Sequence, residues 1–269
     1  MLTIYFSGTG NTEYIAKLFS KKMSATCLSI EEDVDFHEKI QVNDTICFCY
    51  PIYGSRVPAI MRRFVARHGK ILKGKKLIVL VTQALFSGDG ARVFTDMFPA
   101  EYMEVVYTEH FMMPNNICNF FLLKQESNKK IEKILKRAEA RVEGVCQNIK
   151  NNKRRRRGYS GFSKFLGGFQ GIPWQGKSSC LKVNPYSMEG RAAKSVQIDC
   201  DCTACGLCIK ICPMKNLTLK DDKVIPRNRC IACYRCVNRC PHRAITTFIK
   251  GKPKWKYKGV SQYAKNNNL

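Results

Sequence analysis

Eight cysteines in the last third of the chain fall into two copies of one pattern. Residues 202–213 read CTACGLCIKICP and residues 230–241 read CIACYRCVNRCP, so each copy is C-x2-C-x2-C-x3-C-P. In this spacing three thiolates bind one iron–sulfur cube, and the fourth, before the proline, binds the other cube. The pattern therefore predicts two 4Fe–4S clusters with crossed ligands. One cluster would use Cys202, Cys205, Cys208 and Cys240, and the other Cys230, Cys233, Cys236 and Cys212.

Two other uses of these cysteines fit the spacing less well. A structural zinc site takes four ligands, usually from two CxxC pairs, which leaves the third cysteine and the Cys-Pro of each copy unexplained. A disulfide scaffold needs an oxidising compartment, whereas 15 cysteines without an export signal favour a reducing one. The eight cysteines resemble those of the bacterial two-cluster ferredoxins over residues 196–249. The region has few large apolar residues, so the clusters would act as its core.

The remaining seven cysteines are predicted not to bind iron. Cys47 and Cys49 alternate along an apolar run and are expected on one face of a buried strand. Cys200 stands beside the first ligand and could compete for iron in a misassembled cluster, and Cys180 is expected to be exposed. The other three, expected to be structural, are Cys27, Cys118 and Cys146.

A second stretch with chemical potential is SGTGNT, residues 7–12, between an apolar run and a helical pattern. Backbone N–H groups and hydroxyls at a helix N-terminus bind phosphate without a cation. The stretch lacks the lysine of a Walker loop. A dinucleotide loop is the alternative: Glu31 would suit a ribose contact, but Glu13 replaces the third glycine. The full pattern resembles the FMN phosphate loop of flavodoxins, which implies a site at Ser7, Gly8, Thr9, Gly10, Asn11 and Thr12.

The flavodoxin resemblance implies two further loops around the flavin ring. YPIYGSRVP, residues 50–58, follows the third predicted strand, and TQALFSGDGA, residues 82–91, follows the fourth. Ligands of open α/β sheets bind at these carboxyl ends. Tyr53 would stack on the ring and Gly54 would let the backbone approach it, while ordinary loop packing is the alternative for Tyr53 and Phe86. The candidate residues are Tyr53, Gly54, Gln83, Ala84, Phe86 and Gly88.

Alternating strands and helices must position these loops. The apolar runs predict strands at residues 2–6, 26–30, 44–50, 76–82 and 104–111. Helical spacing predicts helices at 12–22, 58–67, 88–98 and 127–148. A βαβα order of this kind predicts an α/β fold, with an open parallel flavodoxin-like sheet covered on both faces.

Composition changes divide the chain into four predicted parts. Residues 1–150 form the flavodoxin-like FMN-binding domain, and 151–193 a basic, glycine-rich, partly mobile linker. Residues 194–250 form a small α+β two-cluster ferredoxin domain, with a hairpin turning at Asp221–Asp222. Residues 251–269 form a loose basic tail. Together with MMPNN at 112–116, these parts resemble the bacterial flavodoxin–ferredoxin fusion proteins known as EFR-type ferredoxins.

The formal net charge of +25 bears on partners. Opposite fields speed protein association, so an acidic redox protein is the expected partner. Nucleic-acid binding is the alternative, but the sequence has no helix-turn-helix, zinc finger or aromatic stacking motif. A nucleic-acid partner is therefore not expected. Binding to anionic lipid is conceivable, but no amphipathic anchor is evident.

The expected function is electron transfer by a cytoplasmic flavoprotein. No apolar run reaches the ~18–20 residues of a membrane span, and no secretory signal is recognised at the N-terminus. The four histidines lie in no nucleophile motif, so no hydrolytic site is expected. FMN and two 4Fe–4S clusters would exchange electrons with each other and with partner proteins. The alternative is an FMN-dependent reductase that supplies a small-molecule acceptor from its own clusters.

Overall fold

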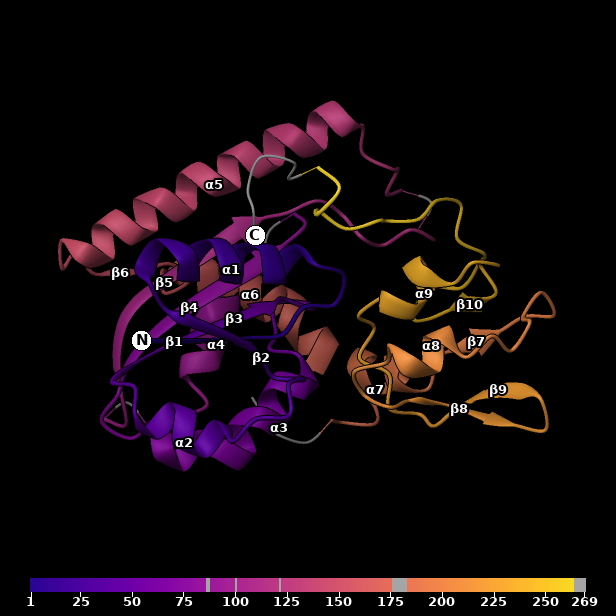
Figure 1. Ribbon diagram of the computed structural model, residues 1–269, viewed down its shortest axis with the longest axis horizontal. Coiled ribbons are helices and arrows are strands. Elements are labelled where there is room, and N and C mark those ends of the chain that lie inside the picture. Colours follow the sequence, from indigo (N-terminus) through magenta and orange to yellow (C-terminus); the bar gives the residue numbers. More distant parts are fainter. Residues whose placement is uncertain (86–87, 100, 121, 176–182, 264–269) are drawn as a thin grey trace.

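A computed structural model describes residues 1–85, 88–99, 101–120, 122–175 and 183–263. It has a parallel sheet covered by helices, and a smaller cysteine-rich part beside the sheet (Figure 1). Within the described residues, no helix is both long and apolar enough to cross a membrane.

The main sheet confirms the predicted flavodoxin-like class and adds one strand. Its order is β2-β1-β3-β4-β5-β6, and all its pairings are parallel. The order reverses between β1 and β3, which is where open α/β sheets bind ligands. The strands are β1 Leu2–Tyr5, β2 Thr26–Ser29, β3 Thr45–Pro51, β4 Lys76–Gln83, β5 Glu104–Met112 and β6 Arg155–Arg156.

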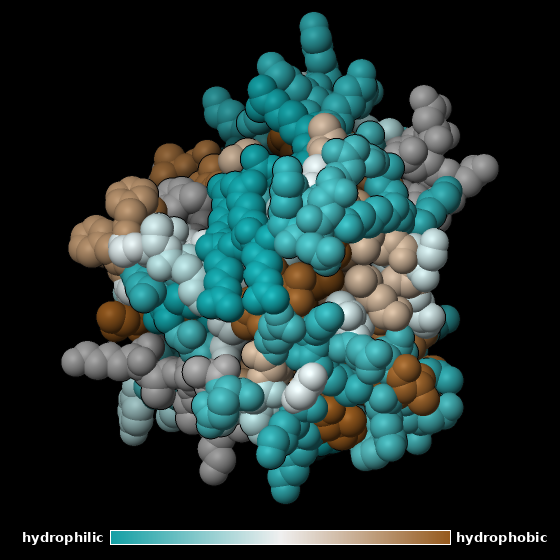
Figure 2. All heavy atoms as spheres, turned by 90° about the vertical axis from the view of Figure 1, so that its left-hand side faces the viewer, coloured by the Kyte–Doolittle hydropathy of each residue, from teal (hydrophilic) through white to brown (hydrophobic). Residues whose placement is uncertain are grey.

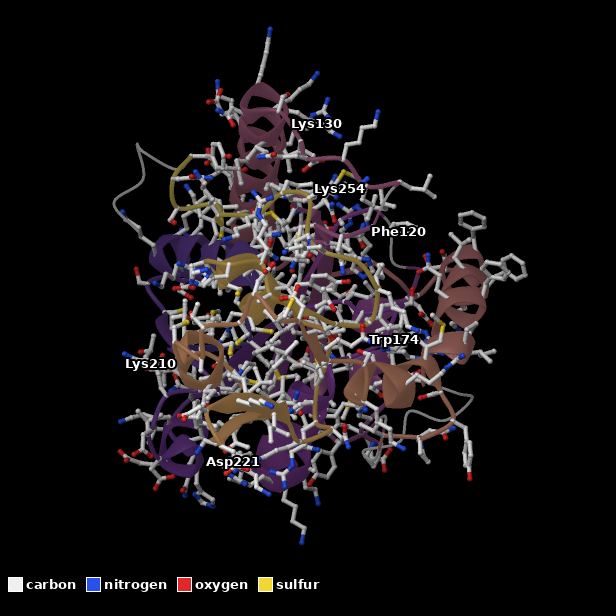
Figure 3. The ribbon with its side chains drawn as sticks, turned by 90° about the vertical axis from the view of Figure 1, so that its right-hand side faces the viewer. Phe120, Lys130, Trp174, Lys210, Asp221 and Lys254 are labelled. Atoms are coloured by element: carbon white, nitrogen blue, oxygen red, sulfur yellow. The ribbon has the colours of Figure 1, made fainter. Side chains whose placement is uncertain are left out.

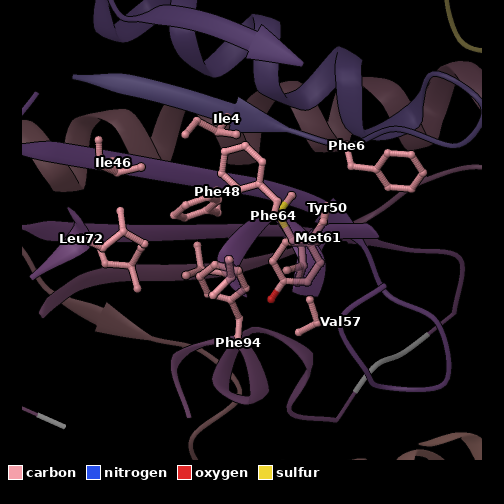
Figure 4. Packing of buried hydrophobic residues seen from close by; sticks show 14 of the residues in the cluster. Ile4, Phe6, Ile46, Phe48, Tyr50, Val57, Met61, Phe64, Leu72 and Phe94 are labelled. Carbon is pink, nitrogen blue, oxygen red and sulfur yellow. The ribbon is translucent and has the colours of Figure 1, made fainter. Parts of the chain in front are cut away.

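Helices cover both faces because the central strands are apolar on both sides. In β3, Cys47 and Cys49 face α1 (Asn11–Met23) and α5 (Asn128–Lys150), as expected for core residues. The alternate residues Phe48 and Tyr50 face the second layer, and Figure 4 shows Phe48, Tyr50 and Phe94 within this core. That layer consists of α2 Phe36–Gln41, α3 Ala59–His68, the 3-10 helix Gly69–Leu72 and α4 Gly90–Thr95. The helix α4 is shorter at both ends than the predicted 88–98.

The segment predicted as a mobile linker, residues 151–193, is built into the fold where the structure describes it. The basic run KRRRR at residues 153–157, the arginine run, supplies β6, which pairs with β5 at the edge of the sheet. The arginine run is held at this edge by the carboxylate of Glu109 on β5, which is only 1% exposed. Arg155 and Arg157 approach it at 3.5 and 3.2 Å, and Arg141 on α5 at 3.5 Å. A buried carboxylate needs such partners, so part of the run is structural.

Two helices follow in the same segment, α6 Gly161–Gln175 and α7 Met188–Ala193. An ion pair between Arg62 on α3 and Glu189 on α7 ties α7 to the α/β part. Their closest atoms are 2.8 Å apart, and the two side chains are 1% and 4% exposed. This pair fixes the chain just before the cysteine-rich part begins.

The cysteine-rich part contains two small antiparallel ladders and two short helices. The predicted hairpin is confirmed: Asp221 and Asp222 have φ of 48° and 55°, as a two-residue type I′ turn requires. The elements are β7 Gln197–Ile198, α8 Leu207–Lys210, β8 Leu217–Lys220, β9 Lys223–Pro226, α9 Arg235–Arg239 and β10 Ile245–Thr246.

The expectation of a loose basic tail is wrong for residues 251–263. Tyr257 and Val260 are 5% and 3% exposed and pack with the core formed by α1 and α5. The Tyr257 hydroxyl donates to Asn11 at the start of α1, and its N–H donates to Asn238 on α9. The tail therefore crosses the phosphate loop and joins the two parts of the molecule. Residues 264–269 lie outside the described residues.

Candidate functional site

The predicted phosphate loop lies between β1 and α1, at the point where the sheet order reverses. Gly10 caps α1 with φ of 100°, a left-handed conformation that suits glycine. Glycine has no side chain that could accept a hydrogen bond. The cap position of α1 therefore provides no side-chain acceptor for the first N–H groups of the helix. Gly10 N–H donates to Ser7 Oγ at 3.0 Å, which tightens the loop. A helix start of this kind attracts an anion.

The three predicted loops meet around one cavity of about 180 Å³. Nine of the twelve predicted flavin-site residues line it: Ser7, Gly8, Thr9, Asn11, Thr12, Tyr53, Gly54, Gln83 and Ala84. Gly10 instead lines the neighbouring cleft towards α9. Gly88 instead packs against α6. A Cβ at Gly88 would lie only 2.2 Å from the backbone nitrogen of Gly167, so this position has room only for glycine. Phe86 lies outside the described residues.

Polar groups in this cavity fit an FMN ring and phosphate. The Tyr53 hydroxyl and the side-chain amide oxygen Oε1 of Gln83 are buried without a hydrogen-bond partner in the described part of the chain. Such groups are costly unless a ligand pairs with them. The Thr12 and Thr82 hydroxyls are hydrogen-bonded at 2.7 Å, and Asn116 Nδ2 donates to Thr9 Oγ1 at 2.9 Å. The residues present thus fit the predicted cofactor.

Segments that sequence reasoning did not assign to the cavity also line it. Among their residues are Trp174 on α6, and Ala232, Tyr234 and Phe248 from the cysteine-rich part. The Trp174 and Phe248 rings stand edge to face, with centroids 5.2 Å apart. Trp174 also explains Gly54, since a Cβ at Gly54 would lie 2.6 Å from the Trp174 side chain. Only the rarity of tryptophan, two in the chain, marked Trp174 in the sequence.

Tyr234 has an unusual backbone for its residue type. Its φ is 60°, in the left-handed region that glycine usually occupies, and Gly206 holds the equivalent place in the first cysteine copy with φ of 74°. Such a conformation is strained for a bulky residue and is found most often at functional sites. The Tyr234 ring lines the flavin cavity, which gives a reason for tyrosine at this strained position.

The structure gathers the eight cysteines into the two predicted sets. Cys212, Cys230, Cys233 and Cys236 line one small cavity. The other quartet, Cys202, Cys205, Cys208 and Cys240, lines a second. Among the described residues, no group of three or more His, Cys, Asp or Glu side chains is arranged to hold a metal ion directly. Each predicted quartet thus shares one cavity.

The thiols of these quartets are held close together and partly away from water. Burial, and next the neighbouring thiols, raise the pKa of Cys208 to about 11. Burial raises the pKa of Cys233 to about 12, and that of Cys236 well above its usual value. Neighbouring thiolates would repel one another, so a bound metal centre would have to supply the positive charge that keeps them deprotonated.

Hydrogen bonds to sulfur surround both quartets. Backbone N–H groups of Asn216 and Ala232 donate to Cys212 and Cys230, each at 3.3 Å, and Ala244 N–H donates to Cys240 at 3.4 Å. The Thr247 hydroxyl lies 3.1 Å from Cys230 Sγ. Donors of this kind orient metal-ligating thiolates and tune cluster potentials.

The flavin cavity and one cysteine quartet are in direct contact. A Cβ on Gly8 would lie 2.8 Å from the backbone oxygen of Cys233 and 3.2 Å from the Tyr53 hydroxyl. Only glycine therefore lets the phosphate loop approach this cysteine so closely. Tyr234, the next residue, lines both the flavin cavity and the cavity of its quartet.

Arg235 holds this contact in place. Its Nε donates to Gly8 O at 3.0 Å, and its Nη atoms donate to Ser7 O at 2.6 Å and Ile211 O at 3.0 Å. They also donate to both oxygens of Glu31, at 2.6 and 2.7 Å. Glu31, the ribose ligand of the alternative dinucleotide site, is thus engaged by the cysteine-rich part.

Comparison with known proteins agrees with this division. A flavodoxin domain family model matches residues 2–122, and a 4Fe-4S dicluster domain model matches residues 201–245. Oxidised Flavodoxin 2 from Bacillus cereus is 21% identical, covers 53% of this chain and 97% of its own, and has a TM-score of 0.37. The flavodoxin, WrbA-like protein from Agrobacterium tumefaciens is 14% identical, covers 56% and 98%, and has a TM-score of 0.40. No curated protein matches the chain.

Proposed function

We propose that this chain, in which a flavodoxin domain is joined to a 4Fe-4S dicluster domain, transfers electrons between a bound FMN and two 4Fe–4S clusters and exchanges them with a partner protein. The approach of Gly8 to Cys233 is the observation that carries the proposal. It joins the two cofactor sites through adjacent residues, so a transferred electron need not cross solvent.

The two quartets differ in their surroundings, which supports an order of transfer. Cys233 is buried against the phosphate loop, and its quartet is the one nearer the flavin cavity. In the other quartet Cys205 is exposed. We infer that the quartet with Cys233 exchanges electrons with the flavin site, and that the quartet with Cys205 exchanges them with partners.

The residues of the chain divide the work of holding the cofactors. When bound, FMN takes up one or two electrons and a 4Fe–4S cluster takes up one. The start of α1 and the hydroxyls of Ser7, Thr9 and Thr12 would hold the phosphate. Tyr53, Trp174 and Phe248 line the cavity and would exclude water from the ring.

The charge of the cysteine-rich part and the first residues of the tail supports an acidic redox partner. Residues 194–258 carry 15 Lys and Arg against four Asp and Glu. Two oxidised clusters with four thiolates each add about −2 apiece, so the region stays positive with both clusters bound. Complementary fields raise association rates more than affinity, and salt screens them. Electron exchange with an acidic partner should therefore slow as salt rises.

Cofactor content and one matched pair of variants test the proposal. Protein purified without oxygen should hold about eight iron, about eight sulfides and one FMN. Cys212→Ala should damage the cluster of Cys233 and abolish rapid exchange with FMN. Cys240→Ala, also before a proline, should damage the other cluster and block exchange with the partner. Electron paramagnetic resonance and stopped-flow absorbance would follow each cofactor.

Three results would contradict the proposal. Zinc without sulfide would remove the clusters. Loss of the Cys205 cluster in Cys212→Ala would disprove the crossed ligand sets. FMN that exchanges electrons equally fast in both variants would disprove the route through Cys233.

A further inference from the structure

The helix α6 presents its large apolar side chains to solvent and Gly167 and Gly171 to the protein. Phe162, Phe165, Phe169 and Ile172 are 72%, 70%, 76% and 48% exposed. Their spacing of three, four and three residues places them on one face of the helix. Figure 3 shows α6 at the right-hand edge, with the labelled Trp174 at its inner end. Few soluble proteins leave a row of this kind uncovered without a use for it.

The orientation of α6 is fixed by its glycine face. A Cβ at Gly167 would lie 1.7 Å from Asp89 Oδ1, and a Cβ at Gly171 would lie 2.1 Å from Arg56 Cζ. Asp89 and Arg56 are themselves buried, 3.7 Å apart. Turning the helix to bury the phenylalanines would push larger side chains into this space. The aromatic row therefore faces outward because no other face of α6 fits the protein.

The segment that carries the aromatic row is basic, and Lys164 lies on α6 itself. Residues 151–175 contain six Lys and Arg and no Asp or Glu. Glu104 and Glu109 take up part of this charge. Within the described ranges, no ion pair involves Lys153, Arg156 or Lys164. In Figure 2 hydrophilic side chains predominate on the face on which β6 lies, and hydrophobic side chains appear at the left-hand edge and in smaller patches elsewhere.

We propose that α6, together with the exposed basic side chains of Lys153, Arg156 and Lys164, forms a peripheral binding surface for an anionic lipid membrane. Aromatic side chains on a rigid helix enter the boundary between headgroups and acyl chains, and nearby basic side chains pair with lipid phosphates. The basic side chains favour a membrane over an apolar protein partner, because an anionic bilayer complements both the aromatic row and the positive charge. The same helix carries Trp174 into the flavin cavity, so the bound membrane lies on the flavin side of the molecule.

Vesicle co-sedimentation of the complete protein tests this surface, with no redox assay needed. Vesicles of phosphatidylcholine mixed with phosphatidylglycerol should sediment the protein, and phosphatidylcholine alone should sediment it far less. Replacing Phe162, Phe165 and Phe169 together by Ser should weaken binding by roughly tenfold or more. Lys164→Gln should weaken it roughly fivefold at low salt and less at high salt.

Exposed apolar residues elsewhere provide the matched control. Val42 is 72% exposed, close to the 76% of Phe169, and lies after α2. Val42→Ser should leave vesicle binding unchanged, whereas Phe169→Ser alone should weaken it. Failure of the wild-type protein to bind anionic vesicles would overturn the proposal. So would equal binding by the triple variant, or a concentration-dependent dimer lost in that variant, which would show that α6 docks a second copy. None of these results bears on the exchange between FMN and clusters.

Discussion

Arg235→Lys should loosen the contact between the phosphate loop and the cysteine-rich part. The guanidinium spans three backbone oxygens, those of Ser7, Gly8 and Ile211, together with the Glu31 carboxylate. Lysine keeps the charge but is a point donor that cannot span these acceptors. The variant therefore separates geometry from charge.

The size of the effect follows from these bonds. About two charge-assisted hydrogen bonds to backbone oxygens should be lost, each of ~1.5–3 kcal/mol. The Glu31 pair contributes at most ~1 kcal/mol, because Glu31 is 29% and Arg235 20% exposed and water screens the pair. Partial rescue by lysine reduces the sum, so we expect a loss of ~2–4 kcal/mol. If urea lowers the free energy by ~2 kcal/mol per molar, the urea concentration at which half of the FMN is released should fall by roughly 1–2 M.

Anaerobic urea titration followed by flavin fluorescence measures this release. Arg239→Lys is the matched control, since Arg239 lies on the same helix, lines the same outer cleft and is exposed. Its change should stay within ~0.5 kcal/mol. If both variants release FMN at the same urea concentration as the wild type, Arg235 does not join the two parts energetically.

Two further predictions concern pH and the tail. Burial, and then two nearby arginines, lower the pKa of His110 to about 3. The unfolded chain then takes up a proton between pH ~6.5 and ~3 that the folded protein refuses, so stability falls as pH drops through this window. The wild type should lose about 2 kcal/mol of unfolding free energy between pH ~7 and ~5 through this group, and His110→Gln should not show this loss. Urea unfolding at each pH measures the free energy, and the same pH dependence for both proteins would disprove the prediction. Tyr257→Phe removes the donor to Asn11 and should weaken FMN binding by ~1 kcal/mol, roughly fivefold, in fluorescence titrations. Tyr263→Phe, which loses only a surface bond to Asn128, should bind FMN as the wild type does.

Local spacing was sufficient to predict the elements that depend on neighbours in the chain. The apolar runs predicted five strands of the sheet to within a few residues, because strand and helix periodicity is a short-range property. The Asp221–Asp222 turn followed in the same way. The cysteine spacing predicted two sets of four, and the structure gathers the same two sets around separate cavities.

The errors came from segments whose structure depends on distant partners. The arginine run was expected in a mobile linker, but it becomes a strand because β5 presents the buried Glu109 to it. The glycines of this segment indicated flexibility, whereas Gly167 and Gly171 are required because Asp89 and Arg56 leave no room for a side chain at these positions. The lysine-rich tail was expected to be loose because the sequence did not show the role of Tyr257, whose hydrogen-bond partner Asn11 is 246 residues away.

The sequence by itself thus determined which cofactor motifs the chain carries, because a cysteine motif or a phosphate loop is encoded by residues a few positions apart. Only the tertiary structure decided how the two sites meet. The contact of Gly8 with Cys233, the entry of Trp174 and Tyr234 into the flavin cavity and the outward aromatic face of α6 all join remote segments. Such contacts depend on complementary shape and charge, and these arise only when the whole chain packs.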